Sequence, residues 1–111
     1  MKNLKYLFSL AAIFLMSFAV QAQNKAEFKV LGNCGMCKTK IEKAAKSVKG
    51  VKMATWDSKA EKITVYYSEK KTELTTIKQA IADVGYDTDT IKAKDEVYDN
   101  LHFCCKYERD L

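Results

Sequence analysis

Residues 26–49, AEFKVLGNCGMCKTKIEKAAKSVK, contain the change of pattern that decides the fold. Apolar and polar side chains alternate over residues 26–31, as they do in a half-buried strand. From residue 37 to residue 49 the apolar side chains recur every three or four positions, which is the spacing of an amphipathic helix. The sequence therefore predicts a strand that passes through a short loop into a helix.

The rest of the chain completes an order of six elements. Residues 51–57 and 62–68 are separated by a polar turn and predict a hairpin of two strands. Residues 73–84 have one apolar helical face and stop at Gly85, and residues 86–94 predict a fourth strand. The order strand, helix, strand, strand, helix, strand predicts an α+β, ferredoxin-like βαββαβ sandwich with both helices on one face of an antiparallel sheet.

The first 22 residues predict a signal peptide. Two lysines precede an apolar run over residues 7–20, and Val20-Gln21-Ala22 offers small residues at a cleavage position. The run is shorter than the roughly 20 residues that a membrane-spanning helix needs. We therefore expect an exported, periplasmic or extracellular protein that begins near Gln23 and has no membrane attachment once the signal is removed.

Length and composition exclude several classes of function. The chain has 111 residues and no proline, and loss of the two leader lysines lowers its net charge from +5 to +3. So small a chain cannot enclose a large substrate cavity beside a core. A charge of +3 without a basic-aromatic stripe gives little footing for nucleic acid. We expect a single domain that is monomeric and is not an enzyme.

Cys34-Gly35-Met36-Cys37 falls where the first strand passes into the first helix. Two thiols three residues apart on a turn can point at one centre, and Gly35 lets the backbone curl close to it. The positive end of the helix dipole favours a thiolate at Cys37. We predict a pair of partly exposed thiolates of low pKa that binds a soft ion, copper(I) or mercury(II), or zinc(II) if further ligands join.

The ordered set of motifs resembles the heavy-metal-associated domain family. This family includes metallochaperones, N-terminal modules of metal-pumping ATPases and extracytoplasmic mercury-binding proteins. The resemblance covers about residues 26–94. It rests on the CxxC motif, Lys-Ile-Glu-Lys-Ala at 40–44, Gly50-Val51, and Ala-Ile-Ala-Asp-Val-Gly-Tyr-Asp at 80–87.

The resemblance implies that residues 23–94 form one such domain and that Cys34 and Cys37 bind the metal. It also implies a metal-donating or metal-accepting partner protein, for example a metal-transporting ATPase. The family usually has methionine two residues before the first cysteine, where this chain has Gly32. Tyr86 follows the second helix at the same end of the fold. It either covers the thiols, as a tyrosine often does in bacterial copper-carrying relatives, or is an ordinary half-buried ring.

Residues 95–111 form a cysteine-containing C-terminal extension that we expect to pack on the domain. It holds Cys104, Cys105 and the only histidine, His102. A fourth strand of about seven residues would carry the chain about 23 Å from the CxxC motif. Ten extended residues span about 33 Å and could return, whereas ten helical residues cover only about 15 Å. Shared ligation therefore requires an extended tail, in which one of the two cysteines faces the site more readily than both.

The tail cysteines have four predicted outcomes: an expanded site of three or four thiolates, a separate site, a disulfide to the CxxC motif, or buried free thiols. We favour the expanded site, with His102 as a weaker candidate ligand. The function predicted is an exported protein that carries or scavenges a soft heavy-metal ion. Two alternatives are a thiol-disulfide exchange protein and a disulfide-stapled structural domain.

Overall fold

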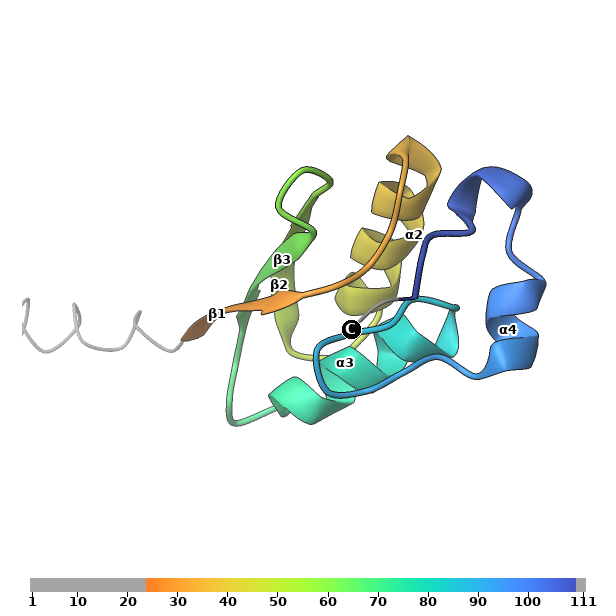
Figure 1. The fold of residues 1–111 in the computed structure, drawn as a ribbon. Coiled ribbons are helices and arrows are strands. Elements are labelled where there is room, and N and C mark those ends of the chain that lie inside the picture. The colour runs from red at the N-terminus through yellow and green to blue at the C-terminus, as the bar shows by residue number, and fades with distance from the viewer. Residues whose placement is uncertain (1–23, 110–111) are drawn as a thin grey trace, which may run out of the picture.

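The computed structural model describes residues 24–109, whose main elements form two layers (Figure 1). One layer is a three-stranded antiparallel sheet with the strand order β1-β3-β2. Its strands are β1 (Asn24–Lys29), β2 (Val51–Asp57) and β3 (Lys62–Tyr67). The second layer and the C-terminal tail contain α2 (Gly35–Lys46), α3 (Leu74–Asp83), the short helix α4 (Asp95–Asp99) and the 3-10 turn η1 (Phe103–Cys105).

This arrangement is the ferredoxin-like α+β fold that the sequence predicts. The strand β2 covers the predicted residues, and α3 begins and ends one residue inside the predicted range. The helix α2 begins two residues earlier than predicted and ends at Lys46 instead of residue 49. None of the helices within residues 24–109 is long and apolar enough to span a membrane. The predicted signal peptide at residues 1–22 lies outside the described part of the chain.

The alternating pattern of β2 and β3 buries one face of the sheet beneath the helices. Trp56, Ile63 and Val65 from the strands are at most 1% exposed, and Ile41 of α2 and Ile81 of α3 are fully buried. Burying each side chain of this size contributes about 1.5–3 kcal/mol. The loop between β1 and α2 is therefore held on both sides by core elements.

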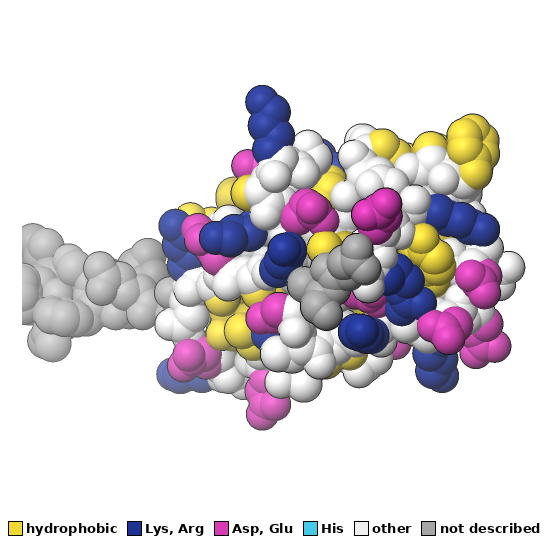
Figure 2. All heavy atoms as spheres, viewed as in Figure 1, with side chains coloured by type: hydrophobic (Ala, Val, Ile, Leu, Met, Phe, Trp, Pro, Cys, Tyr) yellow, Lys and Arg dark blue, Asp and Glu magenta, His cyan; other side chains and the backbone are white. Residues whose placement is uncertain are grey.

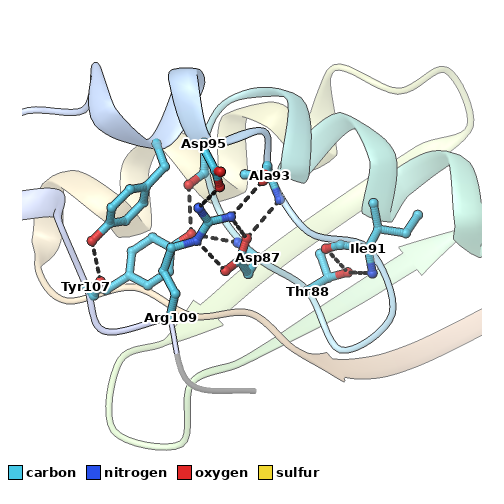
Figure 3. Close-up of polar contacts among 9 residues, drawn as sticks. Asp87, Thr88, Ile91, Ala93, Asp95, Tyr107 and Arg109 are labelled. Carbon is cyan, nitrogen blue, oxygen red and sulfur yellow. Dashed lines mark hydrogen bonds and ion pairs between the residues drawn. The ribbon is translucent and has the colours of Figure 1, made fainter.

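The fourth strand predicted over residues 86–94 is wrong. A single bridge, between Val30 and Thr88, joins this segment to the end of β1. The chain curls instead around the buried Asp87 carboxylate, which accepts a hydrogen bond from the Ala93 amide at 2.8 Å (Figure 3). The Asp87 carbonyl and the Asp89 amide still bond to residues 31 and 29, but the Thr88 and Ala93 amides are bonded inside the loop and cannot extend a ladder.

Because the chain turns back at once, the tail follows a shorter path than predicted. The predicted need for an extended segment over residues 95–104 is wrong, since α4 and η1 are helical turns and no strand first carries the chain away. In Figure 1 the tail rises beside α2, and η1 lies near the N-terminal end of that helix. Leu101, Cys105 and Tyr107 of the tail are at most 8% exposed and belong to the core.

Candidate metal centre

The CxxC motif lies at the N-terminal end of α2. Cys34 has an extended backbone and is the N-cap residue, and Cys37 is in the first turn of the helix. The Lys38 amide donates to the Cys34 carbonyl at 3.0 Å and closes that turn. This geometry directs the Cys37 side chain into the core, where it is fully buried, and leaves the Cys34 side chain partly exposed.

All four cysteines are free thiols and converge on one end of the domain. The Cys34 sulfur is their centre: it lies 3.7 Å from the Cys37 sulfur, 3.7 Å from that of Cys104 and 4.0 Å from that of Cys105. The Cys104 and Cys105 sulfurs are 4.0 Å apart. The sulfur atoms of Cys34, Cys104 and Cys105 all lie within 4.8 Å of one another.

Both tail cysteines therefore face the CxxC loop, and the prediction that one would do so more readily than both is wrong. That prediction assumed an extended segment, in which adjacent side chains point to opposite sides. In η1 the chain turns by about 120° per residue, so neighbouring side chains diverge less. Cys104 is partly exposed on this turn and Cys105 is buried.

His102 precedes η1 and is exposed. Its Nδ1 atom accepts a hydrogen bond from the Cys104 amide at 3.5 Å and lies 3.2 Å from the Cys104 sulfur. The imidazole ring also lies against Phe103, with the ring centroids 4.5 Å apart. The side chain thus caps η1 and touches the rim of the sulfur cluster.

The four thiols differ in acidity. The predicted low pKa is found for Cys34 but is wrong for Cys37. The backbone N–H of Cys37 hydrogen-bonds to the Cys34 sulfur and, with help from neighbouring thiols and against the effect of burial, lowers the pKa of Cys34 to about 7. Burial raises the pKa of Cys37 instead, because a charged sulfur loses its hydration in the core. Burial likewise raises the pKa of both tail cysteines.

Tyr86 is fully buried beside these sulfur atoms, not half-buried. Its ring stacks against Tyr107 of the tail at a centroid distance of 5.8 Å. Burial raises the pKa of Tyr86 well above its usual range, and the Cys105 and Cys37 sulfurs add to this effect. The hydroxyl oxygen makes no hydrogen bond of good geometry. A neutral hydroxyl donor therefore stands beside the two buried thiols.

The Trp56 ring packs against the CxxC loop at Gly32, a contact that no pattern in the sequence predicts. A Cβ atom at Gly32 would lie 3.0 Å from the Trp56 ring and 3.2 Å from Ile41. The indole N–H donates to the Val30 carbonyl at 3.0 Å and fixes the ring in this place. Gly32 is the residue that could have indicated this contact, because a glycine leaves room for a large neighbouring side chain.

One further contact of the tail was not predictable from local patterns. The Asn33 side-chain amide donates to the Lys106 carbonyl at 3.0 Å, which ties the CxxC loop to the residue after η1. Apolar side chains also reach the surface near the cluster: Phe103 is 80% exposed and Met36 is 43% exposed. In Figure 2 hydrophobic side chains gather at the surface on the side where η1 lies in Figure 1.

The fold and this site define a class: ferredoxin-like domains with a cysteine pair at the first strand–helix junction. The heavy-metal-associated domain model matches residues 33–87, and the chain belongs to that family. It is 38% identical to the copper chaperone CopZ of Enterococcus hirae over 68 residues, which are 60% of this chain and 99% of CopZ. The family match ends at residue 87, so the tail cysteines lie beyond it.

Two other similarities extend this picture. The chain is 35% identical over 63 residues to the copper-exporting P-type ATPase of Bacillus subtilis, a match that covers 56% of this chain and 8% of the ATPase. The crystal structure of oxidized MerP from Ralstonia metallidurans CH34 superposes with a TM-score of 0.58 and 26% identity, and the match covers 61% of this chain and 96% of MerP. The fold is thus shared with MerP, and the sequence similarity extends to a segment of a copper-exporting ATPase.

Proposed function

We propose that this protein is an exported carrier or scavenger of a soft heavy-metal ion, copper(I) or mercury(II), which it binds through Cys34 and Cys37. The observation that carries the proposal is the Cys34 thiol, partly exposed, with a pKa of about 7 and 3.7 Å from a second sulfur. About half of such a thiol is ionised at neutral pH, and a thiolate is the ligand that soft ions prefer.

The two cysteines have different parts in this mechanism. Cys34 faces solvent and makes the first bond to the arriving ion, and buried Cys37 then gives up its proton and makes the second. Transfer is a ligand exchange in which a partner's thiolate bonds to the ion as the bond to Cys34 breaks. Because both ligands bind deprotonated, uptake releases protons and weakens in acid.

The partner we propose is a metal-donating or metal-accepting protein, such as a metal-transporting ATPase. The similarity to a copper chaperone and to a segment of a copper-exporting ATPase supports this choice. Export rests on the leader at residues 1–22. Expression of the whole gene followed by N-terminal sequencing tests it, with Gln23 expected as the first residue of the exported protein. A chain that retains Met1 in the cell overturns export.

The binding test is a titration of the reduced protein with copper(I), mercury(II) and zinc(II), against a Cys34→Ser/Cys37→Ser variant. We expect tight binding of one soft ion per chain in the wild type and its loss in the variant. Equal binding by the two proteins would reject the proposal. Circular dichroism of the apo-proteins shows whether the variant keeps its fold.

The lowered pKa of Cys34 also favours a second candidate, thiol-disulfide exchange with Cys37 as the resolving thiol. In that case a Cys34–Cys37 disulfide forms as a substrate disulfide is reduced, and two electrons pass to the substrate. Purification under reducing conditions followed by metal analysis separates the two functions. Exchange predicts turnover of a model disulfide and no retained metal, whereas a carrier retains the ion.

A further inference from the structure

We propose that Cys104 and Cys105 join Cys34 in a three-thiolate site, closed by the C-terminal tail, and that the tail must detach before the ion is transferred. This inference rests on the proposed metal-binding function and specifies its regulation. Cys34 belongs to both arrangements: it pairs with Cys37 in the open form and with the two tail cysteines in the closed form. The tail thus decides whether the protein retains its ion or releases it.

The distances between sulfur atoms support three-fold ligation. The Cys34 sulfur lies 3.7 Å from that of Cys104 and 4.0 Å from that of Cys105, and the two tail sulfurs are 4.0 Å apart. Three sulfurs about 2.3 Å from one ion in a trigonal arrangement are about 4.0 Å from each other, whereas a linear pair is separated by about 4.6 Å. The three thiols therefore stand near ligating positions already.

Tyr86 provides an independent observation. Its hydroxyl is fully buried, makes no hydrogen bond of good geometry, and has the Cys105 and Cys37 sulfurs beside it. An unpaired buried donor is costly, and a thiol is a weak acceptor. A metal-bound cysteine is a thiolate, which accepts a hydrogen bond much better. The hydroxyl thus has the position of an outer-sphere donor to a Cys105 thiolate in the closed site.

The tail is held in place by a cluster of polar contacts, the Arg109 latch, formed by Arg109, Asp87, Ala93 and Asp95 (Figure 3). Arg109 donates to both carboxylate oxygens of buried Asp87 at 2.8 Å, to Asp95 at 2.8 Å and to the Ala93 carbonyl at 2.6 Å. These contacts fix the chain four residues after Cys105.

Three further hydrogen bonds hold the tail. The Tyr107 hydroxyl donates to the Gly85 carbonyl and accepts from the Asp87 amide, each at 2.8 Å. On the other side of the cluster, Asn33 binds the Lys106 carbonyl at 3.0 Å. Ligands that are positioned before the ion arrives bind it with less loss of conformational entropy. The Arg109 latch therefore acts at a distance, by keeping the two tail thiols beside Cys34.

Opening and transfer form one balanced exchange. When the tail detaches, the bonds from the ion to Cys104 and Cys105 break, and each of these sulfurs takes up a proton, one equivalent to that released by Cys37 and one from the solvent. Cys37 gives up its proton and binds the ion, which is then held by Cys34 and Cys37. A thiolate of the acceptor protein replaces them as in any ligand exchange. No change of oxidation state is needed.

The test compares the copper(I) complexes of the wild type, Cys104→Ser/Cys105→Ser and Cys37→Ser by X-ray absorption and by competition with a chromophoric copper(I) chelator. We expect three or more sulfur neighbours in the wild type and two in the Cys104→Ser/Cys105→Ser variant, with at least ~10-fold weaker binding. Cys37→Ser keeps three sulfurs. Cys104→Ser alone, at a partly exposed position, serves as a second variant if the double variant does not fold.

A third variant tests the latch without touching a ligand. We expect Arg109→Ala to release copper(I) to the chelator at least ~10-fold faster than the wild type. Lys70→Ala removes an exposed charge at the opposite end of the fold and is the control, with an unchanged rate. Two sulfurs in the wild type, or equal affinity with and without the tail cysteines, overturns this inference while the proposed function stands. Absence of binding by the wild type overturns both.

Discussion

The CxxC loop and the tail bring their cysteines to one place, but different forces hold them there. Cys34 and Cys37 are attached to α2, whose Ile41 is buried among strand side chains. The tail adds three buried side chains, Leu101, Cys105 and Tyr107, to the core. It is also held by the contacts of Arg109 with buried Asp87. The first pair is fixed by the burial of the helix that carries it, whereas the second also depends on a cluster of polar contacts around Arg109, which a single substitution can break.

This difference assigns the two pairs to different roles. A site on a core helix keeps its geometry in every folded molecule, which suits the ligands that must always be ready for an arriving ion. A site on a latched segment can exist in two states whose balance a partner can shift. Substitutions that weaken one region without the other therefore test whether the division is real.

The largest effect is expected from Trp56→Ala, which removes the ring beneath the CxxC loop. The ring is 1% exposed, and its loss leaves a large cavity together with an unpaired Val30 carbonyl. We expect a loss of about 4 kcal/mol in the free energy of unfolding, measured by urea denaturation. Phe103→Ala in the tail is the control: that ring is 80% exposed and its removal should cost less than about 0.5 kcal/mol. Equal losses would erase the contrast between the regions.

Arg109→Ala comes next and should act mainly on the tail. Burial alone would raise the pKa of Asp87, but Arg109 and the Ala93 amide outweigh it and hold that pKa below its usual value. Removing the guanidinium leaves a buried charge uncompensated, at a cost of about 3 kcal/mol. Hydrogen exchange should show faster exchange in the tail amides, with β3 and α2 less affected. Uniform loss of protection would show that the tail is not a separate unit.

The same ion pair gives the Arg109→Ala variant a distinct pH dependence. A carboxyl whose folded pKa is depressed stabilises the fold above its unfolded pKa of about 3.9 and loses this contribution as pH falls through the folded value. Wild-type stability should therefore fall in this acid range by more than that of Arg109→Ala. Parallel curves from pH 6 to pH 2 would contradict this assignment to Asp87.

The next prediction concerns the reactivity of the cysteines in the folded protein. The pKa of Cys34 is about 7, whereas burial raises that of Cys37 and of both tail cysteines. Alkylation of the apo-protein by iodoacetamide should label Cys34 first, and its rate should rise about tenfold from pH 6 to pH 8 as the thiolate fraction grows. Peptide mass mapping identifies the labelled residue. First labelling of Cys104, which is also partly exposed, would contradict the ranking.

The sequence predicts the regular elements well because their signal is local. Alternation and three-to-four spacing locate three strands and two helices to within a few residues, and they place the CxxC motif at the right junction. The fourth strand fails because the chain curls around the Asp87 carboxylate, which binds the Ala93 amide and Arg109, a residue 22 positions further along the chain. No local pattern records such a pairing.

The path of the C-terminal tail to the CxxC loop was predicted wrongly for the same reason. The expected path of the chain to Cys104 depended on that strand, so the error in one element became an error in the geometry of the next. Convergence of the cysteines is nevertheless visible in the structure, with Cys104 3.7 Å from Cys34. The sequence does indicate that the tail contributes to the site, because the two remaining cysteines and the only histidine lie in one short segment.

The smallest effect is expected at Gly32, and it tests how closely the CxxC loop depends on the core. An alanine Cβ there would meet the Trp56 ring at 3.0 Å and Ile41 at 3.2 Å, so one of these core side chains must shift by a few tenths of an ångström. We expect a loss of about 1 kcal/mol in the free energy of unfolding, with a change in the fluorescence of Trp56, the only tryptophan.

Gly35→Ala is the matched control for Gly32→Ala, because it also adds one methyl group to the CxxC loop. A Cβ at Gly35 meets nothing within 4 Å, and the residue begins α2, where alanine is a better helix former than glycine. Its stability should therefore equal or slightly exceed that of the wild type. If both variants lose the same free energy, the loop resists substitution through its own backbone and not through Trp56, and the contrast between a core-supported loop and a latched tail loses its physical basis.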